Sequence, residues 1–249
     1  MNIQFRMRQA RYRRVAAFSA ALAAAFASLA TAADPANLEG TWKITAPRGS
    51  FVPEGGPISF TKAGAERYRR NQDLRARGKY EDFDYASGRC ASPGTPRLML
   101  TPERFRIWQR PGMVLLQFEW NRQLRQIDMG TLTAQSRLLP GPMSPNEDLT
   151  GRSTPVALGH WEGKTLVAKS SGFNDGTLVD ALVPHGWDLK VTERLSLKDA
   201  NTLEDRITIE DPEFFEKAWQ TVVTYTRQPD APFREDVCLE RLASGPAPL

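Results

Sequence analysis

The chain has 249 residues but only two histidines and two cysteines, and this scarcity limits its chemistry. A metal site built on histidine would have to use both His160 and His185, which stand 25 residues apart. With Asp175, Asp180 or Asp188 they could supply two histidines and a carboxylate. Nothing in their spacing holds them together. We therefore expect no metal site, with His160 at a strand end and His185 in a loop.

The sequence motifs of common catalytic and cofactor sites are missing as well. There is no G-x-S-x-G, no H-E-x-x-H, no G-x-x-x-x-G-K and no G-x-G-x-x-G. These motifs position a nucleophilic serine, a zinc ion, a phosphate group and a dinucleotide. We therefore expect no cofactor, and any catalysis would depend on acid–base side chains alone.

Acidic residues are absent from the first 32 positions. Five arginines precede an apolar run over residues 15–30, and the small residues Ala30-Thr31-Ala32 follow. This order is typical of a secretory signal peptide, and the run is too short to be a stable membrane span. We predict cleavage after Ala32 and a single mature domain, residues 33–249, in the periplasm or secreted. Arg13-Arg14 would also suit a twin-arginine signal, but the residues after it fit that signal poorly.

Removal of this segment changes the charge balance. The whole chain has 33 Lys+Arg against 29 Asp+Glu, and the loss of five arginines leaves 28 against 29. Phosphate backbones bind to a concentrated positive surface. The mature chain is therefore not expected to bind nucleic acid, and we interpret the arginines of residues 67–77 as a solvated helix face.

The two cysteines, Cys90 and Cys238, lie far from the predicted cleavage point, which excludes a lipid-anchored N-terminal cysteine. In an oxidising compartment a single pair most simply forms one disulfide. It would close a loop of about 150 residues, worth roughly 5 kcal/mol at most. Two free buried thiols are the alternative.

Alternating apolar residues and turn signals predict a mainly β protein. Eight strand-like runs follow one another at short spacing, the number expected of a barrel or a sandwich. They cover residues 38–44, 104–109, 113–120, 124–129, 165–169, 190–197, 203–210 and 219–227. One helix is expected from Lys62 to about Arg77, capped by Thr61. The proline-rich stretch 139–155 predicts a long loop, either a plain surface loop or a flap over a barrel mouth.

The motif Leu38-x-Gly-x-Trp42 resembles the opening of lipocalin-type barrels. The resemblance implies that this tryptophan plugs the closed end of a barrel while an arginine stacks across it. Together with the strand pattern, it leads us to expect a single antiparallel β-barrel of the lipocalin/calycin kind.

Glu119 is conspicuous because its neighbours, residues 115–120, are otherwise mostly apolar. Alternation places it on one face with Leu115 and Gln117. If that face lines the lumen, Glu119 would be a desolvated acid or would pair with a cation such as Arg125. If the face is solvent-exposed, Glu119 is an ordinary surface residue.

Several segments together resemble a family of secreted bacterial proteins of unassigned function. The most distinctive is Trp161-Glu-Gly-Lys-Thr-Leu-Val167 followed by Gly172-Phe-Asn-Asp175, and further matches occur at residues 90–97, 191–194, 208–212 and 237–238. The resemblance implies a cysteine at each of the two cysteine positions. Relatives carry extra histidines where this chain has Arg152 and Lys190, so a histidine-centred site would be depleted here.

Three functional classes remain open. The first is a barrel that binds a small apolar or aromatic molecule through Glu119, Gln117, Arg125 and Trp187. The second is a cofactor-independent isomerase, cyclase or lyase in which Glu119, His185 and Asp180 act as acid and base. The third is an envelope protein that contacts another protein and has no ligand. The oligomeric state cannot be inferred from the sequence.

Overall fold

The computed structural model describes residues 34–130, 156–173, 176–234 and 236–243. One compact unit spans Ala33–Leu249. The predicted signal peptide, residues 1–32, and the proline-rich stretch, residues 139–155, lie outside the described residues. No helix of the described part is long and apolar enough to cross a membrane.

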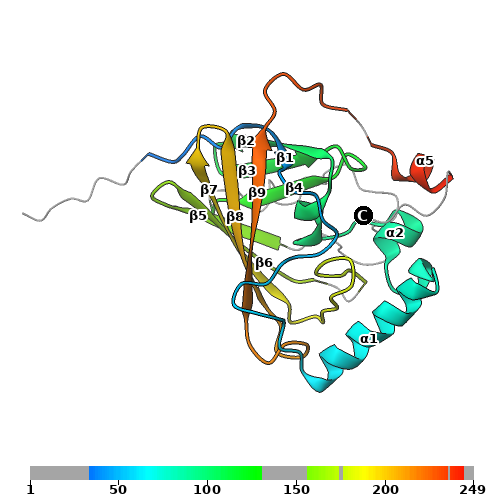
Figure 1. Cartoon of the computed structure of the whole chain (residues 1–249). Coiled ribbons are helices and arrows are strands. Elements are labelled where there is room, and N and C mark those ends of the chain that lie inside the picture. Colours follow the sequence, from blue (N-terminus) through cyan, green and yellow to red (C-terminus); the bar gives the residue numbers. More distant parts are fainter. Residues whose placement is uncertain (1–33, 131–155, 174–175, 235, 244–249) are drawn as a thin grey trace, which may run out of the picture. The chain divides into compact units, whose positions relative to one another are not determined.

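Nine strands form a closed barrel in which each strand pairs with its neighbours in the sequence and β1 pairs with β9 (Figure 1). The strands are β1 (Gly40–Ile44), β2 (Arg104–Arg110), β3 (Met113–Phe118), β4 (Leu124–Asp128), β5 (Val156–Glu162), β6 (Thr165–Ser171), β7 (Lys190–Asp199), β8 (Thr202–Glu210) and β9 (Trp219–Arg227). The predicted barrel is therefore confirmed. It is not purely antiparallel, however, because β4 and β5 run parallel and pair at only two positions, Ile127 with Ala157 and Asp128 with Leu158.

The barrel wall follows the alternation of the sequence. Along β8, for example, Leu203, Asp205, Ile207 and Ile209 are fully buried, whereas the residues that alternate with them are partly or fully exposed. Successive side chains of a strand point to opposite faces of the sheet. The buried set therefore faces the barrel interior, where it packs with the inward residues of the other strands into one hydrophobic core.

One end of the barrel is closed by Trp42 and Arg227. The Trp42 side chain is fully buried, and its indole N–H donates to the carbonyl of Leu38 at 3.0 Å. The Arg227 guanidinium lies over the Trp42 ring, 4.2 Å from its centroid. Gly40 has a φ of +133°, a backbone conformation that residues with a Cβ rarely adopt, so this position favours glycine. The lipocalin-like motif is thereby explained, and the stacked arginine that it implied is present.

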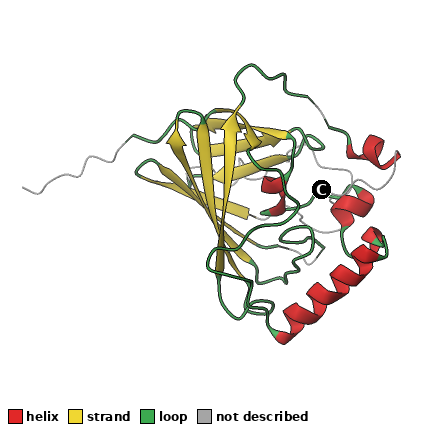
Figure 2. Cartoon of the chain, viewed as in Figure 1, coloured by secondary structure: helices red, strands yellow, loops and turns green. Residues whose placement is uncertain are grey.

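The helices lie outside the barrel (Figure 2). They are α1 (Lys62–Ala76), α2 (Tyr85–Arg89) and α5 (Cys238–Ala243), with the 3-10 turns η1 (Tyr80–Asp82) and η2 (Arg97–Leu100). Helix α1 begins as predicted, since the hydroxyl of Thr61 accepts from the N–H of Gly64. The turn η2 reaches the core: its residues Leu98 to Leu100 are buried, and the Tyr225 hydroxyl donates to the carbonyl of Met99 at 3.0 Å.

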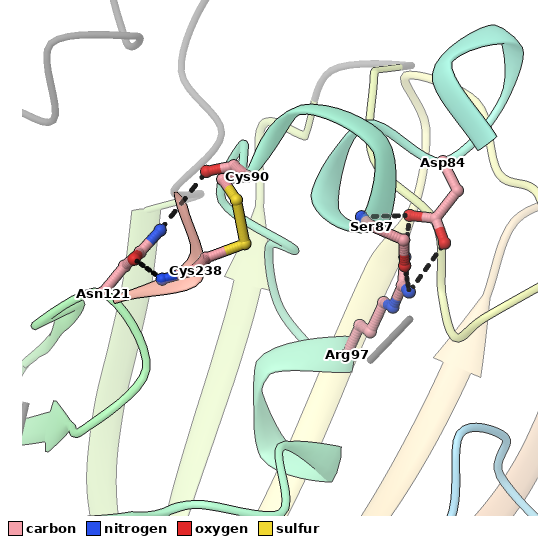
Figure 3. The surroundings of a disulfide bond; sticks show 6 residues. All are labelled: Asp84, Ser87, Cys90, Arg97, Asn121 and Cys238. Carbon is pink, nitrogen blue, oxygen red and sulfur yellow. Dashed lines mark hydrogen bonds and ion pairs between the residues drawn. A yellow bond between two sulfur atoms is a disulfide. The ribbon is translucent and has the colours of Figure 1, made fainter. Parts of the chain in front are cut away.

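The disulfide between Cys90 and Cys238 is formed, as predicted, and joins the end of α2 to the start of α5 (Figure 3). Asn121 bridges the same two residues, because its side chain donates to the Cys90 carbonyl and accepts from the Cys238 N–H. Nearby, the buried Arg97 guanidinium binds both carboxylate oxygens of Asp84, the N-cap of α2. The segments outside the barrel are therefore held by specific polar and covalent contacts.

We predict that Trp42→Ala lowers the free energy of unfolding by about 3–5 kcal/mol, the usual cost of deleting a large core aromatic side chain. Chemical denaturation of the folded protein measures this loss.

Trp187→Ala is the matched control, because the Trp187 side chain is 66% exposed. It should change the stability by no more than about 0.5 kcal/mol. A loss below about 1 kcal/mol for Trp42→Ala would contradict its role in closing the barrel.

Candidate functional site

Charged side chains lie inside the barrel among otherwise apolar neighbours. Arg125 of β4, Glu193 of β7 and Asp205 of β8 are all buried, together with Ser170 of β6 and Tyr225 of β9. We call these five residues the interior cluster. Burying a charge is costly unless the charge is paired, so the partners of each group indicate what the cluster can do.

Arg125 and Glu193 form a two-armed ion pair. Nη1 of Arg125 donates to Oε1 of Glu193 at 2.8 Å, and Nη2 donates to Oε2. Nη2 also reaches the hydroxyl of Ser170 at 3.4 Å. Burial alone would lower the pKa of Arg125, but the charge and hydrogen bonds of Glu193 outweigh this effect and raise it. The guanidinium is therefore a permanent cation whose two terminal nitrogens already have partners.

Asp205 is the second acid of the cluster, and it forms hydrogen bonds with the Glu193 side chain and the backbone of Arg194. Its side chain is 0% exposed. Burial, followed by the negative charge of Glu193, raises the pKa of Asp205 well above its ordinary value, and Arg125 offsets only part of this. The neutral acid is therefore favoured, and its proton can be donated to the Glu193 carboxylate.

Tyr225 completes the cluster as a neutral phenol. Burial, followed by the charges of Asp205 and Glu193, raises the pKa of Tyr225 well above its ordinary value. Its hydroxyl donates a hydrogen bond to the carbonyl of Met99. Tyr225 therefore contributes an aromatic ring beside the two acids, and its ring meets Phe105 edge-on at 5.0 Å.

A groove of about 490 Å³ opens where the β2–β3 hairpin faces the end of β5. It is lined by Pro35, Gln109, Arg110, Pro111, Gly112, Met113, Val114, Met129, His160 and Trp161. Val114 also faces the barrel interior, where it is buried, and its partner on β4 is Ile127. Arg125 lies two residues before Ile127 and faces the same side. None of the five residues of the interior cluster lines the groove, so the two are separate features of the barrel.

Glu119 does not pair with Arg125, so that prediction is wrong. Its buried carboxylate accepts from the backbone N–H of Arg104 at 3.0 Å and of Arg234 at 2.6 Å, and the Arg104 guanidinium lies 3.3 Å away. Glu119 follows the last residue of β3 and holds the segment after β9 against the barrel. These contacts assign it a structural role.

Gln117 was a candidate ligand-binding residue if its face, shared with Leu115, lined the lumen, and it does not line the lumen. Both are only half-buried, whereas Leu116 and Phe118 have no exposed surface. Of the two alternatives, the inward face of β3 is therefore the one that carries Leu116 and Phe118. Arg125 does lie in the interior, as the prediction for a lumen cation required, but its partner is Glu193.

The other two predicted catalytic residues, Asp180 and His185, are not brought together with Glu119. Both lie in the segment between β6 and β7. Asp180 is buried and accepts from three backbone N–H groups, those of Phe51, Leu182 and Val183. Its pKa is raised because burial outweighs these hydrogen bonds. His185 is buried and contacts the Thr177 hydroxyl and a backbone carbonyl.

Trp187 and His160 are exposed. The Trp187 side chain is 66% exposed and takes no part in the interior. His160 lies on the outer side of β5, where it meets Glu162 at 3.0 Å. Since His185 is buried in a loop, the two histidines of the chain do not form a common site.

Comparisons with known proteins do not identify a family. No protein-family model matches the chain, and no curated protein matches its sequence. Among solved structures, the chain is similar to the crystal structure of a mutant of the fluorescent protein UnaG, with 14% identity and a TM-score of 0.34. That comparison covers 78% of this chain and 97% of the other. The barrel assignment therefore rests on the chain's own strand pairing, and membership of the secreted bacterial family stays a prediction.

We predict that Asp205→Asn raises the free energy of unfolding at pH 7, because burial and the charge of Glu193 raise the pKa of Asp205 in the folded protein above its value in the unfolded chain. Below about pH 4 the wild-type acid is protonated in both states, so the two proteins should be equally stable. As the pH rises, the unfolded chain ionises while the folded chain keeps its proton, and the wild type loses stability. Urea denaturation at several pH values measures this difference.

Asp180→Asn is the matched control, because its carboxylate is fully hydrogen-bonded to backbone N–H groups. It should lose about 1–3 kcal/mol, the cost of leaving a buried donor without its acceptor. A similar loss for Asp205→Asn would show that the Asp205 carboxyl has a structural role.

Proposed function

We propose that this protein binds a small apolar or aromatic molecule where the β2–β3 hairpin faces β5. The observation that carries the proposal is the groove of about 490 Å³ at this position. Small-molecule sites commonly have volumes of about 300–1,000 Å³ and are lined by apolar and aromatic side chains with a few polar groups. The groove has both the volume and the lining of such a site.

The side chains of the groove favour an apolar ligand. Trp161 supplies a large ring, and Met113 and Met129 supply flexible, polarisable thioethers that adapt to irregular shapes. Arg110 at the rim is held by Glu39 at 2.7 Å. Because this cation is already paired, we assign the affinity mainly to apolar contact.

A second candidate function is proton transfer without a cofactor. Asp205 favours its neutral form beside the carboxylate of Glu193, so an acid and a base lie next to each other in the interior. A general acid and a general base at one site are the minimum for isomerisation or elimination. Glu193 is a weak candidate base, however, because both of its oxygens bind Arg125.

We also propose that the protein is exported and acts in the periplasm or outside the cell. The arginine-rich, apolar and small-residue regions of residues 1–32 support export. The Cys90–Cys238 disulfide supports an oxidising compartment, where such bonds persist.

Titration with 1-anilinonaphthalene-8-sulfonate, a fluorescent apolar probe, tests the binding proposal. We expect saturable binding of one probe molecule per chain. Trp161→Ala should weaken it at least tenfold, because it removes the largest ring of the groove. Native mass spectrometry of the periplasmic protein should also show a co-purified small molecule.

Leu158→Ala is the matched control, because Leu158 lies on the same strand but is 52% exposed on the outer face. It should bind the probe as the wild type does. If the probe does not saturate and no molecule co-purifies, the binding proposal is wrong.

Intact-mass analysis of the exported protein tests the location. The mature chain should begin at Ala33 or Asp34 and show no thiol that can be alkylated before reduction. A chain that keeps residues 1–32, or two thiols that react without reduction, would contradict export to an oxidising compartment.

A further inference from the structure

Helix α1 and the residues just after it hold a concentration of positive charge that the rest of the barrel domain lacks. Residues 62–79 contain seven Lys+Arg and two Asp+Glu, a net charge of +5. Residues 33–249 as a whole contain 28 against 29, which leaves 21 against 27 outside this segment. The charge of the domain is therefore segregated, with one basic helix on an otherwise acidic protein.

The cations of this segment are exposed, and most of them are unpaired. All seven have exposed side chains. Within the described part of the chain, only Arg77 forms an ion pair, with Asp73 one turn earlier in the helix. A helix of 15 residues is about 22 Å long. The protein therefore presents a long positive surface that it does not neutralise itself. The cations that form no ion pair are Lys62, Arg67, Arg69, Arg70, Arg75 and Lys79.

Contacts on one side of α1 hold the helix in place and leave its basic side free. The buried Asn71 side chain donates to the carbonyl of Leu182 at 2.8 Å, and Leu74 packs with Phe83 and Leu178. The exposed cations occupy the rest of the helix circumference. The positive surface is therefore part of the folded domain and needs no rearrangement to meet a partner.

An exposed tryptophan lies at the same end of the domain as the first turn of α1. The Trp187 side chain is 66% exposed. Its neighbour Gly186 packs so closely on Glu213 and Phe214 that a Cβ there would stand 2.5 Å from the Glu213 carboxylate. The same two residues hold the start of α1, because the Thr61 hydroxyl donates to the carbonyl of Glu213 at 2.6 Å and the Thr61 N–H donates to that of Phe214 at 3.0 Å.

The chemistry of this surface favours phospholipid as its partner. Guanidinium groups bind phosphate through two parallel hydrogen bonds, so arginines suit lipid phosphates. Tryptophan settles where the headgroups of a bilayer meet its acyl chains, a boundary that nucleic acids and acidic proteins do not offer. We infer that α1 and Trp187 form a docking surface for a membrane that contains anionic phospholipids. This surface is separate from the groove of the proposed binding function.

Docking of this kind is peripheral and electrostatic. No helix of the described residues is long and apolar enough to cross a membrane. Each Lys or Arg close to an anionic bilayer strengthens binding about fivefold. In 1 M salt the screening length falls to about 3 Å, so this attraction is largely lost.

Cosedimentation of the mature protein with lipid vesicles tests the inference. One set of vesicles contains phosphatidylcholine alone, and in the other about a third of the lipid is phosphatidylglycerol. The protein should bind the anionic vesicles at least tenfold more tightly, and 1 M NaCl should abolish the difference. This comparison uses the wild type only. Equal binding to both kinds of vesicle, or no binding to either, would overturn the inference.

A double variant assigns the binding to α1. Arg67→Gln together with Arg70→Gln should weaken binding to the anionic vesicles at least tenfold, because it removes two cations of about fivefold each. The matched control is Lys164→Gln together with Lys169→Gln, which removes the same charge from exposed positions of the β5–β6 hairpin. The control should bind as the wild type does. If the two double variants bind equally well, the inference is wrong.

Tryptophan fluorescence distinguishes a bilayer from other anionic partners. Anionic vesicles should shift the emission of the wild type to shorter wavelength, and Trp187→Ala should remove this shift. A wild-type emission that does not shift, or tighter binding to duplex DNA or polyglutamate than to the vesicles, would overturn the inference. The groove is tested separately by the anilinonaphthalene probe, so either proposal can fail without the other.

Discussion

The ion pair of Arg125 and Glu193 joins strands at the part of the barrel where the fewest residues pair between neighbouring strands. Strands β4 and β5 share only two register positions, so few hydrogen bonds join the first four strands to the last five at this junction. Arg125 of β4 reaches past β5 to Ser170 of β6 and Glu193 of β7. Removing one partner of such a buried pair leaves a bare charge and typically costs about 3–5 kcal/mol. The same pair also allows a second acid, Asp205, to remain inside.

The sequence predicted the barrel wall well because alternation is a local signal. The last strand was predicted with the bounds that the structure shows, residues 219–227, and helix α1 began at its predicted cap. Strand β5 was missed. Its outer face exposes Leu158, and Gly159 faces inward, where a Cβ would stand 2.5 Å from the Ile127 side chain. In β5, tertiary packing therefore places an apolar residue on the outer face and a glycine on the inner face. This is the reverse of the alternation by which a strand is recognised in a sequence.

The candidate site was predicted less well, for a physical reason. Glu119 drew attention because it stands alone in an apolar run, yet the interior acids lie in charged stretches, Thr192-Glu193-Arg194 and Glu204-Asp205-Arg206. The available signal was the alternation of the strand: Asp205 is two residues from both Leu203 and Ile207, so it lies on the same buried face as they do. Alternation places a side chain inside or outside but does not show whether it has a partner. Glu119 is satisfied by backbone groups that come from distant segments, which no local pattern reveals.

The disulfide imposes an order of events on the chain. Cys90 precedes β2 and Cys238 follows β9, at a sequence separation of 148. The bond can therefore form only after every strand has been synthesised, and oxidation can lock the barrel but cannot guide its early assembly. Strand β1 lies outside the covalent ring, although its hydrogen bonds with β9 close the barrel. The disulfide and the strand pairing thus close different parts of the chain: among the strands of the described residues, β2 to β9 lie within the covalent ring, whereas β1 is held by hydrogen bonds alone.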